Sequence, residues 1–439
     1  MSNRKFDSVY TVEQWQQLEA AVFDGAGDAL QRVRDYARAN RRPPIAFLVA
    51  CALYAITATP GRVRLDAGVG PGAPNMFVVL MARPGGGKDQ LINAASDAVC
   101  VFAADDQLGV PMSPKTHTVG SGEGVLTSLM PEQDGQPGPS VLFTVTEVGL
   151  MGALAERQGS TLRPHLLNIY SGGALALNNR KEKLWVEPNS YRAGMVLGAQ
   201  PDKAGFIVSG QDDGFKHRFV FVEVLDPLRD TGREYPTVDL RPVLVPSSVM
   251  NGTPMGAAPS VRRRVLRERD ETLMYGPPVD GGGHRMFTTL KLAMGLALLR
   301  SGEQIEEEDY QRAAALMDFS DAIARGCEAH LERQQVEEAA TRLERKDAAE
   351  EAMLERAKPR ARTRILEVVQ QADGAPVPSS PVRQGLRGDK RPAFDAVLGE
   401  LAALDAVHQI EEEGTKRPML IRGAAFDAAL EKYGESYPS

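Results

Sequence analysis

The segment that decides the fold of this 439-residue chain is MFVVLMARPGGGKD, residues 76–89. Its first six residues are continuously apolar, which is typical of a strand buried on both faces of a parallel sheet. A glycine-rich turn follows directly, and a helix is predicted from there to about residue 104. This order of strand, glycine turn and helix predicts an α/β unit with an anion-binding turn.

The turn has the chemistry that phosphate groups require. Glycines let backbone N–H groups face an anion, a lysine can reach the β- and γ-phosphates, and a helix N-terminus adds its positive dipole. We therefore predict a P-loop that binds ATP together with Mg²⁺. The residues predicted to hold the nucleotide are Pro84, Gly85, Gly86, Gly87, Lys88 and Asp89. A glycine-rich turn with a chance lysine is the simpler alternative.

Two positions differ from the usual pattern of such a site. Asp89 stands where a Ser or Thr hydroxyl normally ligates Mg²⁺, and Thr146 stands where an Asp normally ends the second apolar strand, 140–146. Glu147 comes next and is predicted to polarise the attacking water. One hypothesis is that Asp89 and Thr146 have exchanged roles as metal partners, which keeps the charge of the site. The alternative is a decayed site that binds nucleotide poorly and hydrolyses none.

The hydrophobic pattern divides the chain into five parts, and the second part alternates predicted strands and helices. Pro359 is expected to end the helix of the fourth part, and three small helices before a β-hairpin predict the fold of the last. The parts are an N-terminal helical segment (1–59), a P-loop ATPase core (60–226), a connector and helical lid (227–335), a charged helical linker (336–358) and a winged-helix-like α+β domain (359–439).

A second β-hairpin is predicted at 175–186, and its tip carries Arg180, Lys181 and Lys183. Such a cluster can bind a nucleic-acid backbone even on a chain whose formal net charge is −7. A solvated hairpin tip would have the same composition. Trp185, which follows the cluster, is expected to be a core residue rather than a platform for base stacking.

Cysteine usage and hydropathy favour a cytoplasmic protein. The three cysteines, Cys51, Cys100 and Cys327, lie far apart, which disfavours a disulfide framework and a structural zinc site. The polar N-terminus does not resemble a signal peptide. The longest apolar run, 45–57, is too short to span a bilayer and predicts a buried helix, so no membrane partner is expected.

Three blocks resemble the P-loop helicase-type domain of phage and plasmid replication proteins, a domain of unknown function that often lies beside primase modules. They are the predicted P-loop, the block 146–149, and the block 198–202 followed by 213–219. The resemblance covers roughly residues 45–335. It implies an AAA+-like core, similar to helicases of the superfamily 3 and minichromosome-maintenance types.

The resemblance also implies roles for single residues. Gln200 matches a polar residue that follows the fourth core strand and senses the γ-phosphate, and Arg218 matches an arginine finger that acts on a neighbouring subunit. A turn residue and a surface salt bridge are the ordinary alternatives for these two positions. The basic hairpin is implied to line a central channel. His284, Arg285 and Lys291 are candidates for a phosphate contact from the lid.

The favoured function is an ATP-dependent helicase or translocase motor for phage or plasmid DNA replication. It would act on single-stranded or forked DNA as a homo-oligomeric ring, a hexamer being favoured, with a primase or other replication protein as a further partner. Two alternatives stay open: an initiator or helicase loader that binds nucleotide and DNA without translocating, and an inactive assembly scaffold. Turnover stimulated by DNA separates the motor from both.

Overall fold

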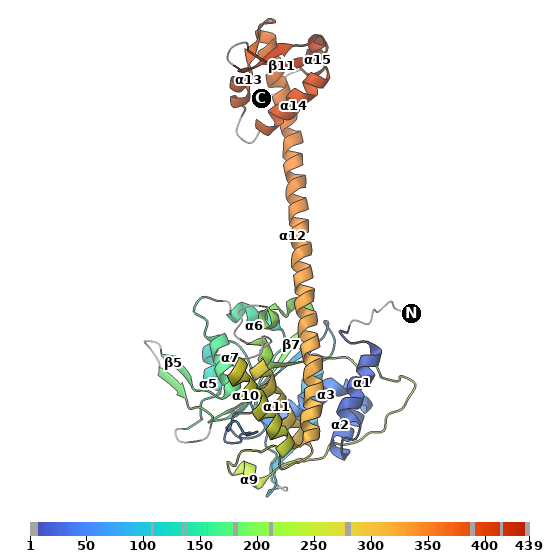
Figure 1. Ribbon diagram of the computed structural model, residues 1–439, viewed down its shortest axis with the longest axis vertical. Coiled ribbons are helices and arrows are strands. Elements are labelled where there is room, and N and C mark those ends of the chain that lie inside the picture. The colour runs from blue at the N-terminus through green and yellow to red at the C-terminus, as the bar shows by residue number, and fades with distance from the viewer. Residues whose placement is uncertain are drawn as a thin grey trace. The chain divides into compact units, whose positions relative to one another are not determined.

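The computed structural model describes residues 8–106, 109–133, 136, 138–155, 157–178, 183–209, 214–276, 282–386, 391–412 and 416–434. The chain divides into two compact units, Met1–Glu332 and Arg333–Ser439 (Figure 1). Each unit has its own hydrophobic core. The candidate site belongs entirely to the first.

A five-stranded parallel sheet forms the centre of the first unit, with the strand order β3-β4-β7-β1-β8. Every residue of the strands β1, β7 and β8 is buried, as the apolar runs predict. The mixed α/β fold with a central parallel sheet is therefore confirmed. The strands are β1 (Met76–Met81), β3 (Lys115–Thr118), β4 (Ser140–Val145), β7 (Arg192–Ala199) and β8 (Phe219–Glu223).

The helix predicted to reach residue 104 is shorter in the structure. The helix α4 spans Lys88–Ala98, and Val99 is already extended. The strand β2 (Val101–Ala103) follows and pairs with β9 (Val243–Val245). Valine and phenylalanine in this stretch fit a pleated, half-buried surface better than a helix, which explains the early end of α4.

The predicted N-terminal helical segment is part of the core of the first unit. It contains α1 (Val12–Phe23), α2 (Asp28–Ala39) and α3 (Pro44–Thr57). Every residue of α3 is buried, because this helix packs on the strands of the sheet and on α11 (Gly282–Leu299). The buried helix predicted at 45–57 is thus confirmed, as expected for a helix that is apolar on all sides.

The predicted hairpin at 175–186 is confirmed by the antiparallel pairing of β5 (Leu175–Asn178) with β6 (Lys183–Val186). The described part of the segment 229–283, in which the sequence shows little pattern, contains β9, two complete helices and the start of α11. The remaining described elements of this unit are α5 (Gly122–Ser128), α6 (Val148–Ala155), α7 (Leu162–Ser171), η1 (Pro201–Lys203), α8 (Gly205–Val208), η2 (Lys216–Arg218), α9 (Ser247–Met250) and α10 (Pro259–Tyr275).

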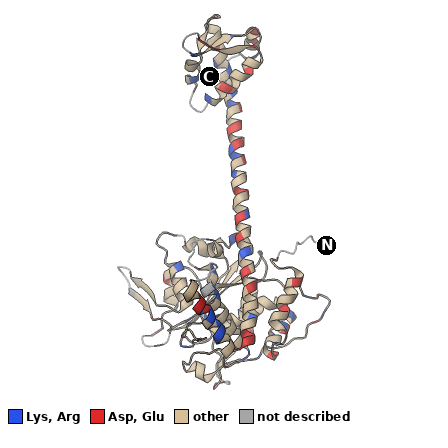
Figure 2. Cartoon of the chain, in the orientation of Figure 1, with Lys and Arg blue, Asp and Glu red and all other residues tan. Residues whose placement is uncertain are grey.

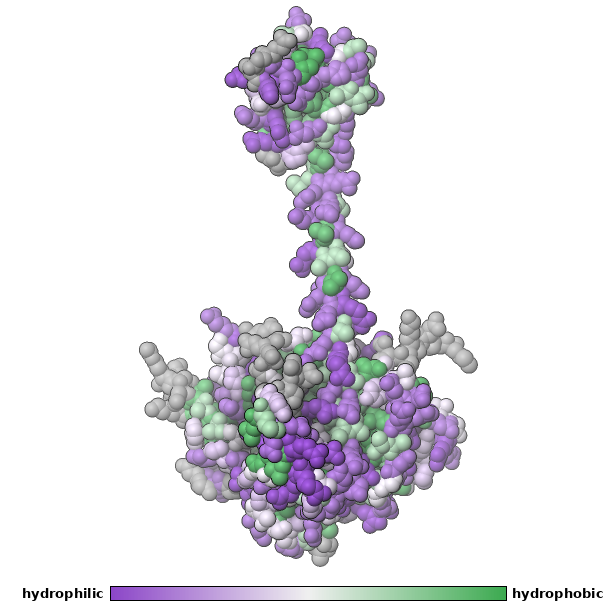
Figure 3. Space-filling view, viewed as in Figure 1, coloured by the Kyte–Doolittle hydropathy of each residue, from purple (hydrophilic) through white to green (hydrophobic). Residues whose placement is uncertain are grey.

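The helix α12 (Glu307–Gln371) continues through Pro359, so the predicted end of a helix at this proline is wrong. Proline removes one backbone hydrogen bond, but packing on both sides of it can hold the helix together. Ala357 and Ala361 flank Pro359 and are both buried in the core of the second unit. The predicted charged linker 336–358 is part of α12, and its side chains carry charges of both signs (Figure 2). They are mainly hydrophilic, as Figure 3 shows.

The second unit has a small α+β fold. Its three-stranded antiparallel sheet has the order β10-β12-β11 and packs with the end of α12 and three shorter helices. Helices therefore precede a hairpin as predicted, while the predicted tip at 413–415 lies outside the described residues. The elements are β10 (Val377–Pro378), α13 (Ser379–Gln384), α14 (Arg391–Ala403), β11 (Val407–Glu411), β12 (Pro418–Arg422) and α15 (Phe426–Tyr433).

No helix within the described part of the chain is long and apolar enough to cross a lipid bilayer.

Candidate functional site

The glycine-rich turn joins β1 to α4 at the carboxyl edge of the parallel sheet. Gly85 and Gly87 have φ angles of 76° and 79°, in the left-handed region that favours glycine. Gly87 precedes α4 and has no side chain that could cap the free N–H groups of its first turn. Residues 83–86 are exposed. The turn therefore offers backbone donors and a helix N-terminus to solvent, as an anion site requires.

Lys88 lies against the end of β7. Its Nζ donates a hydrogen bond to the carbonyl oxygen of Ala82 at 3.1 Å. A Cβ atom built on Gly198 would come within 3.1 Å of Lys88 Cε and within 2.6 Å of the carbonyl oxygen of Thr146. Since only a residue without a side chain fits there, Gly198 allows the turn after β1 and the end of β4 to meet.

Two carboxylates accompany this lysine. Burial lowers the pKa of Lys88, while the charges of Asp89 and Glu147 raise it. Asp89 is exposed in the first turn of α4, and Glu147 is exposed just after β4. The structure thus brings Lys88, Asp89 and Glu147 to one place, with Thr146 beside them.

The residues present fit a Mg²⁺ ion that is held partly by nucleotide. Within the described residues, no group of three or more His, Cys, Asp and Glu side chains could hold a metal ion. Mg²⁺, however, is commonly bound through one or two carboxylates together with phosphate oxygens and waters. Asp89 at the start of α4 is the carboxylate that could serve a site of this kind.

Gln200 follows β7, which is the fourth strand of the central sheet in chain order. The backbone N–H of Ala82 donates to the carbonyl oxygen of Ala199 at 3.0 Å, so the start of the glycine turn lies beside the end of β7. Gln200 is half-buried at this edge. This place agrees with the position that the resemblance implies, and the role in sensing phosphate stays a prediction.

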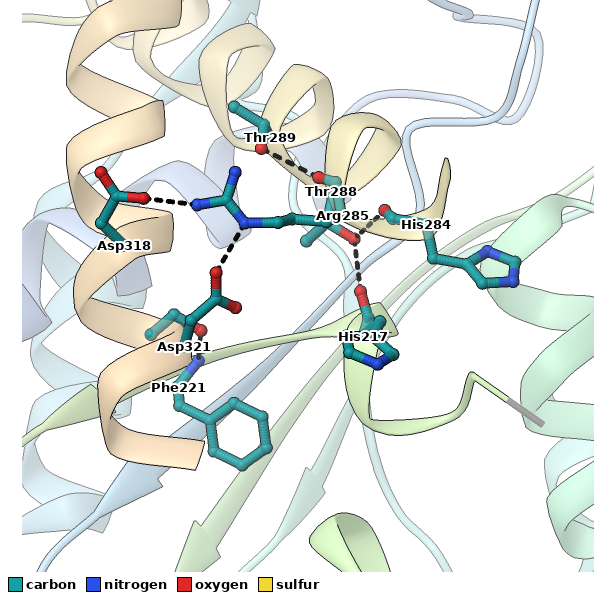
Figure 4. Close-up of polar contacts among 9 residues, drawn as sticks. His217, Phe221, His284, Arg285, Thr288, Thr289, Asp318 and Asp321 are labelled. Atoms are coloured by element: carbon teal, nitrogen blue, oxygen red, sulfur yellow. Dashed lines mark hydrogen bonds and ion pairs between the residues drawn. The ribbon is translucent and has the colours of Figure 1, made fainter. Parts of the chain in front are cut away.

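Arg218 points inward in the single chain. It ends η2, is 9% exposed, and its guanidinium lies 5.7 Å from the centre of the Tyr170 ring. The neighbouring residue of η2 is fixed by α11, because Thr288 Oγ1 lies 2.9 Å from the carbonyl oxygen of His217 (Figure 4). A role in trans therefore requires Arg218 to leave this position.

The side chains of two of the three lid candidates, Arg285 and Lys291, have other partners. Arg285 forms ion pairs of 2.6 Å with Asp318 and Asp321 of α12, and the carbonyl oxygen of His284 lies 2.9 Å from the Thr288 hydroxyl (Figure 4). Lys291 is completely buried and donates to two backbone carbonyl oxygens. Burial holds the pKa of Lys291 well below its usual range. The prediction that Lys291 contacts a phosphate is wrong, because this side chain is enclosed in the core.

The basic tip of the hairpin lies largely outside the residues that the structure describes. Arg180 and Lys181 are not among the described residues, and Lys183 is described as the start of β6 without its side chain. Trp185 is 54% exposed and donates to Glu187 Oε1 at 2.8 Å. The prediction of a core tryptophan is wrong, because the alternation of β6 buries Val186 and turns Trp185 to the other face.

The sequence analysis did not single out Lys203. This residue ends η1, three positions after Gln200, and its side chain is exposed. Its Cδ lies 4.0 Å from the place that a Cβ would take on Gly149, two residues after Glu147. The signal in the sequence was its position: it follows the same buried strand as Gln200.

Comparison with known proteins gives this chain no family. The sequence matches no protein-family model, and no curated protein matches it. The functional interpretation therefore depends on the groups that meet at the carboxyl edge of the sheet.

Proposed function

We propose that this chain is an ATP-dependent motor of the DNA helicase or translocase type, which works as a ring of identical subunits in phage or plasmid DNA replication. The observation that supports it best is the meeting of the glycine turn, Lys88, Asp89 and Glu147 at one edge of a parallel sheet. Open α/β sheets bind their ligands at this edge. A glycine turn before a helix, with a lysine and a glutamate beside it, suits a nucleoside triphosphate best.

The proposal gives each group a task. Lys88 and the N–H groups of the turn would bind the β- and γ-phosphates, and Glu147 would orient and polarise the water that attacks the γ-phosphorus. Attack forms a bond from phosphorus to the water oxygen and breaks the bond to the β–γ bridging oxygen, which gives ADP and phosphate, while the proton released from the water passes by way of Glu147 to solvent. Mg²⁺, held by Asp89 and Thr146, would neutralise phosphate charge. Gln200 would contact the γ-phosphate from the end of β7.

The DNA part of the proposal is supported by the hairpin and by the second unit. An exposed tryptophan beside a basic tip suits single strands, because bases stack on aromatic rings and phosphates attract lysine and arginine. In the second unit helices precede a β-hairpin, the order from which the sequence predicts a winged helix, and such a domain would contact DNA or a replication partner. A second candidate is a nucleotide-dependent initiator or helicase loader, which the inward position of Arg218 favours.

The test is steady-state ATP hydrolysis by the purified full-length protein with and without single-stranded DNA. DNA is expected to raise turnover of the unchanged protein, and Lys88→Ala is expected to remove it. Arg218→Ala is expected to bind nucleotide but to lose turnover, with thermal unfolding measured alongside because this arginine is buried. Nucleotide binding without any turnover in the unchanged protein would overturn the motor and favour the loader or an inactive scaffold.

The altered metal positions give a separate prediction. Asp89→Ser is expected to lower turnover by about tenfold or more, because Mg²⁺ loses a partner whose replacement typically costs 10–100-fold. Adding Thr146→Asp is expected to restore much of the loss by returning the carboxylate to the site. The measurement is turnover against Mg²⁺ concentration for the single and double variants. A double variant that is no better than Asp89→Ser contradicts the exchange of roles.

A further inference from the structure

Lys203 is a second cation at the carboxyl edge of the sheet. The backbone N–H of Lys203 donates to the carbonyl oxygen of Gln200 at 3.0 Å, which closes the short helix η1. The next residue, Ala204, is completely buried and anchors the end of this turn. The backbone of Lys203 is therefore fixed between β7 and the core, while its side chain stays exposed to solvent.

The side chain of Lys203 lies over the segment that carries the predicted catalytic glutamate. Its Cδ is 4.0 Å from the Cβ position of Gly149, and Glu147 lies two residues before that glycine. Lys88 meets the same region at Gly198, because a Cβ built on that glycine would lie 3.1 Å from Lys88 Cε and 2.6 Å from the carbonyl oxygen of Thr146. Both lysines therefore lie close to the segment in which β4 ends.

We propose that Lys203 is a second phosphate-binding residue, supplied by the same chain, that contacts the γ-phosphate of ATP. This inference rests on the proposed function. Hydrolysis by Glu147 requires the γ-phosphate to lie near this carboxylate and near Lys88. Lys203 lies close to the segment that follows Glu147, and its charge acts on Lys88.

The electrostatics of the site agree with an anion at this position. The charge of Lys203 contributes to lowering the pKa of Lys88, so the two ammonium groups repel each other. Asp89 and Glu147 act in the opposite direction, and each of them affects the pKa of Lys88 more strongly than Lys203 does. A γ-phosphate near both lysines would be attracted by both, so the pair would favour a triphosphate over a diphosphate.

The test compares the affinities of the full-length protein for ADP and for the β,γ-imido analogue of ATP, both with Mg²⁺, by titration calorimetry. Lys203→Ala is expected to weaken binding of the analogue by about tenfold, the size of one charge-assisted hydrogen bond, and to leave ADP binding unchanged. Lys203→Arg is expected to retain the high affinity for the analogue. Lys115→Ala, which removes an exposed lysine paired with Glu132, is the matched control and should change neither affinity.

The outcomes separate this inference from the proposed function. If Lys203→Ala binds both nucleotides as tightly as the unchanged protein, or weakens both equally, the contact with the γ-phosphate is refuted while the ATP site stands. If the unchanged protein binds neither nucleotide, the proposed function fails and this inference fails with it. Lys88→Ala is expected to weaken the binding of both nucleotides, which would show that the measured binding occurs at the glycine turn.

Discussion

Glu147→Gln is expected to lower ATP turnover by about 10²- to 10⁴-fold, the usual contribution of a general base, while nucleotide binding is retained. Glutamine keeps the size of the side chain but removes the charge that would polarise the attacking water. Glu147 is exposed just after β4, and its charge acts on Lys88, so the loss would occur beside the bound phosphates. The measurement is single-turnover hydrolysis at saturating ATP and Mg²⁺.

The control for this variant is Glu132→Gln, because Glu132 is also exposed and pairs with Lys115 outside the site. It should hydrolyse ATP at the unchanged rate. Glu147→Gln with normal turnover would show that another group activates the water. Loss of binding together with turnover would show that Glu147 holds the nucleotide rather than the water.

Arg192→Met is expected to destabilise the first unit by about 3 kcal/mol or more, since each buried polar group left without a partner costs about 1–3 kcal/mol. Arg192 begins β7 and is completely buried. Its guanidinium donates to Asn75 Oδ1 at 2.9 Å and to Thr59 Oγ1 at 3.3 Å. It also donates to the backbone carbonyl oxygens of Pro60, Gly61 and Val63.

Urea unfolding measures this loss as a lower transition midpoint with an unchanged slope. Arg267→Met is the matched control, because Arg267 is exposed on α10 and its replacement should change stability by less than about 0.5 kcal/mol. A midpoint for Arg192→Met equal to that of the control would show that the buried guanidinium contributes no net stability. Burial already lowers the pKa of Arg192 to about 9, so its charge is held against a large desolvation cost.

The two predictions act at opposite edges of the parallel sheet, because Glu147 follows the carboxyl end of β4 and Arg192 begins the neighbouring strand β7. Arg192 lies at the amino end of β7, where Asn75 joins it to the segment before β1 and to Lys291 of α11. Gln200 and Lys203 lie beyond the carboxyl end of β7. We therefore expect variants at the amino end, such as Arg192→Met, to change stability with little effect on nucleotide affinity. Variants at the carboxyl end are expected to change nucleotide affinity with little effect on stability.

The apolar strands and the turn between β1 and α4 could be predicted from the sequence, because burial on both faces leaves a continuous hydrophobic run. Thr146 and Glu147 could be placed near Lys88 for the same reason, since parallel strands end at one edge. The edge strand β3 could not be predicted. Its residues, Lys115–Thr118, are mostly exposed and polar, so burial leaves no pattern there.

Side-chain directions in the short turns could not be predicted either. Arg218 and Lys203 both end short 3₁₀ helices, yet one is buried and the other is exposed. Lys291 is a polar residue within an apolar helix, and only the tertiary structure shows the two carbonyl oxygens that receive its hydrogen bonds. Local sequence carries no information on these distant partners.

The helix α3 also has a consequence for the chain during its synthesis. Its fourteen residues are apolar or small and are all buried, but the strands and α11 that cover them come later in the sequence. At a translation rate of about 5–20 residues per second, α3 leaves the ribosome on the order of ten seconds or more before α11 does. During that interval the nascent chain exposes a hydrophobic segment that a chaperone would bind. Overexpression without added chaperone is therefore expected to increase the insoluble fraction of the protein.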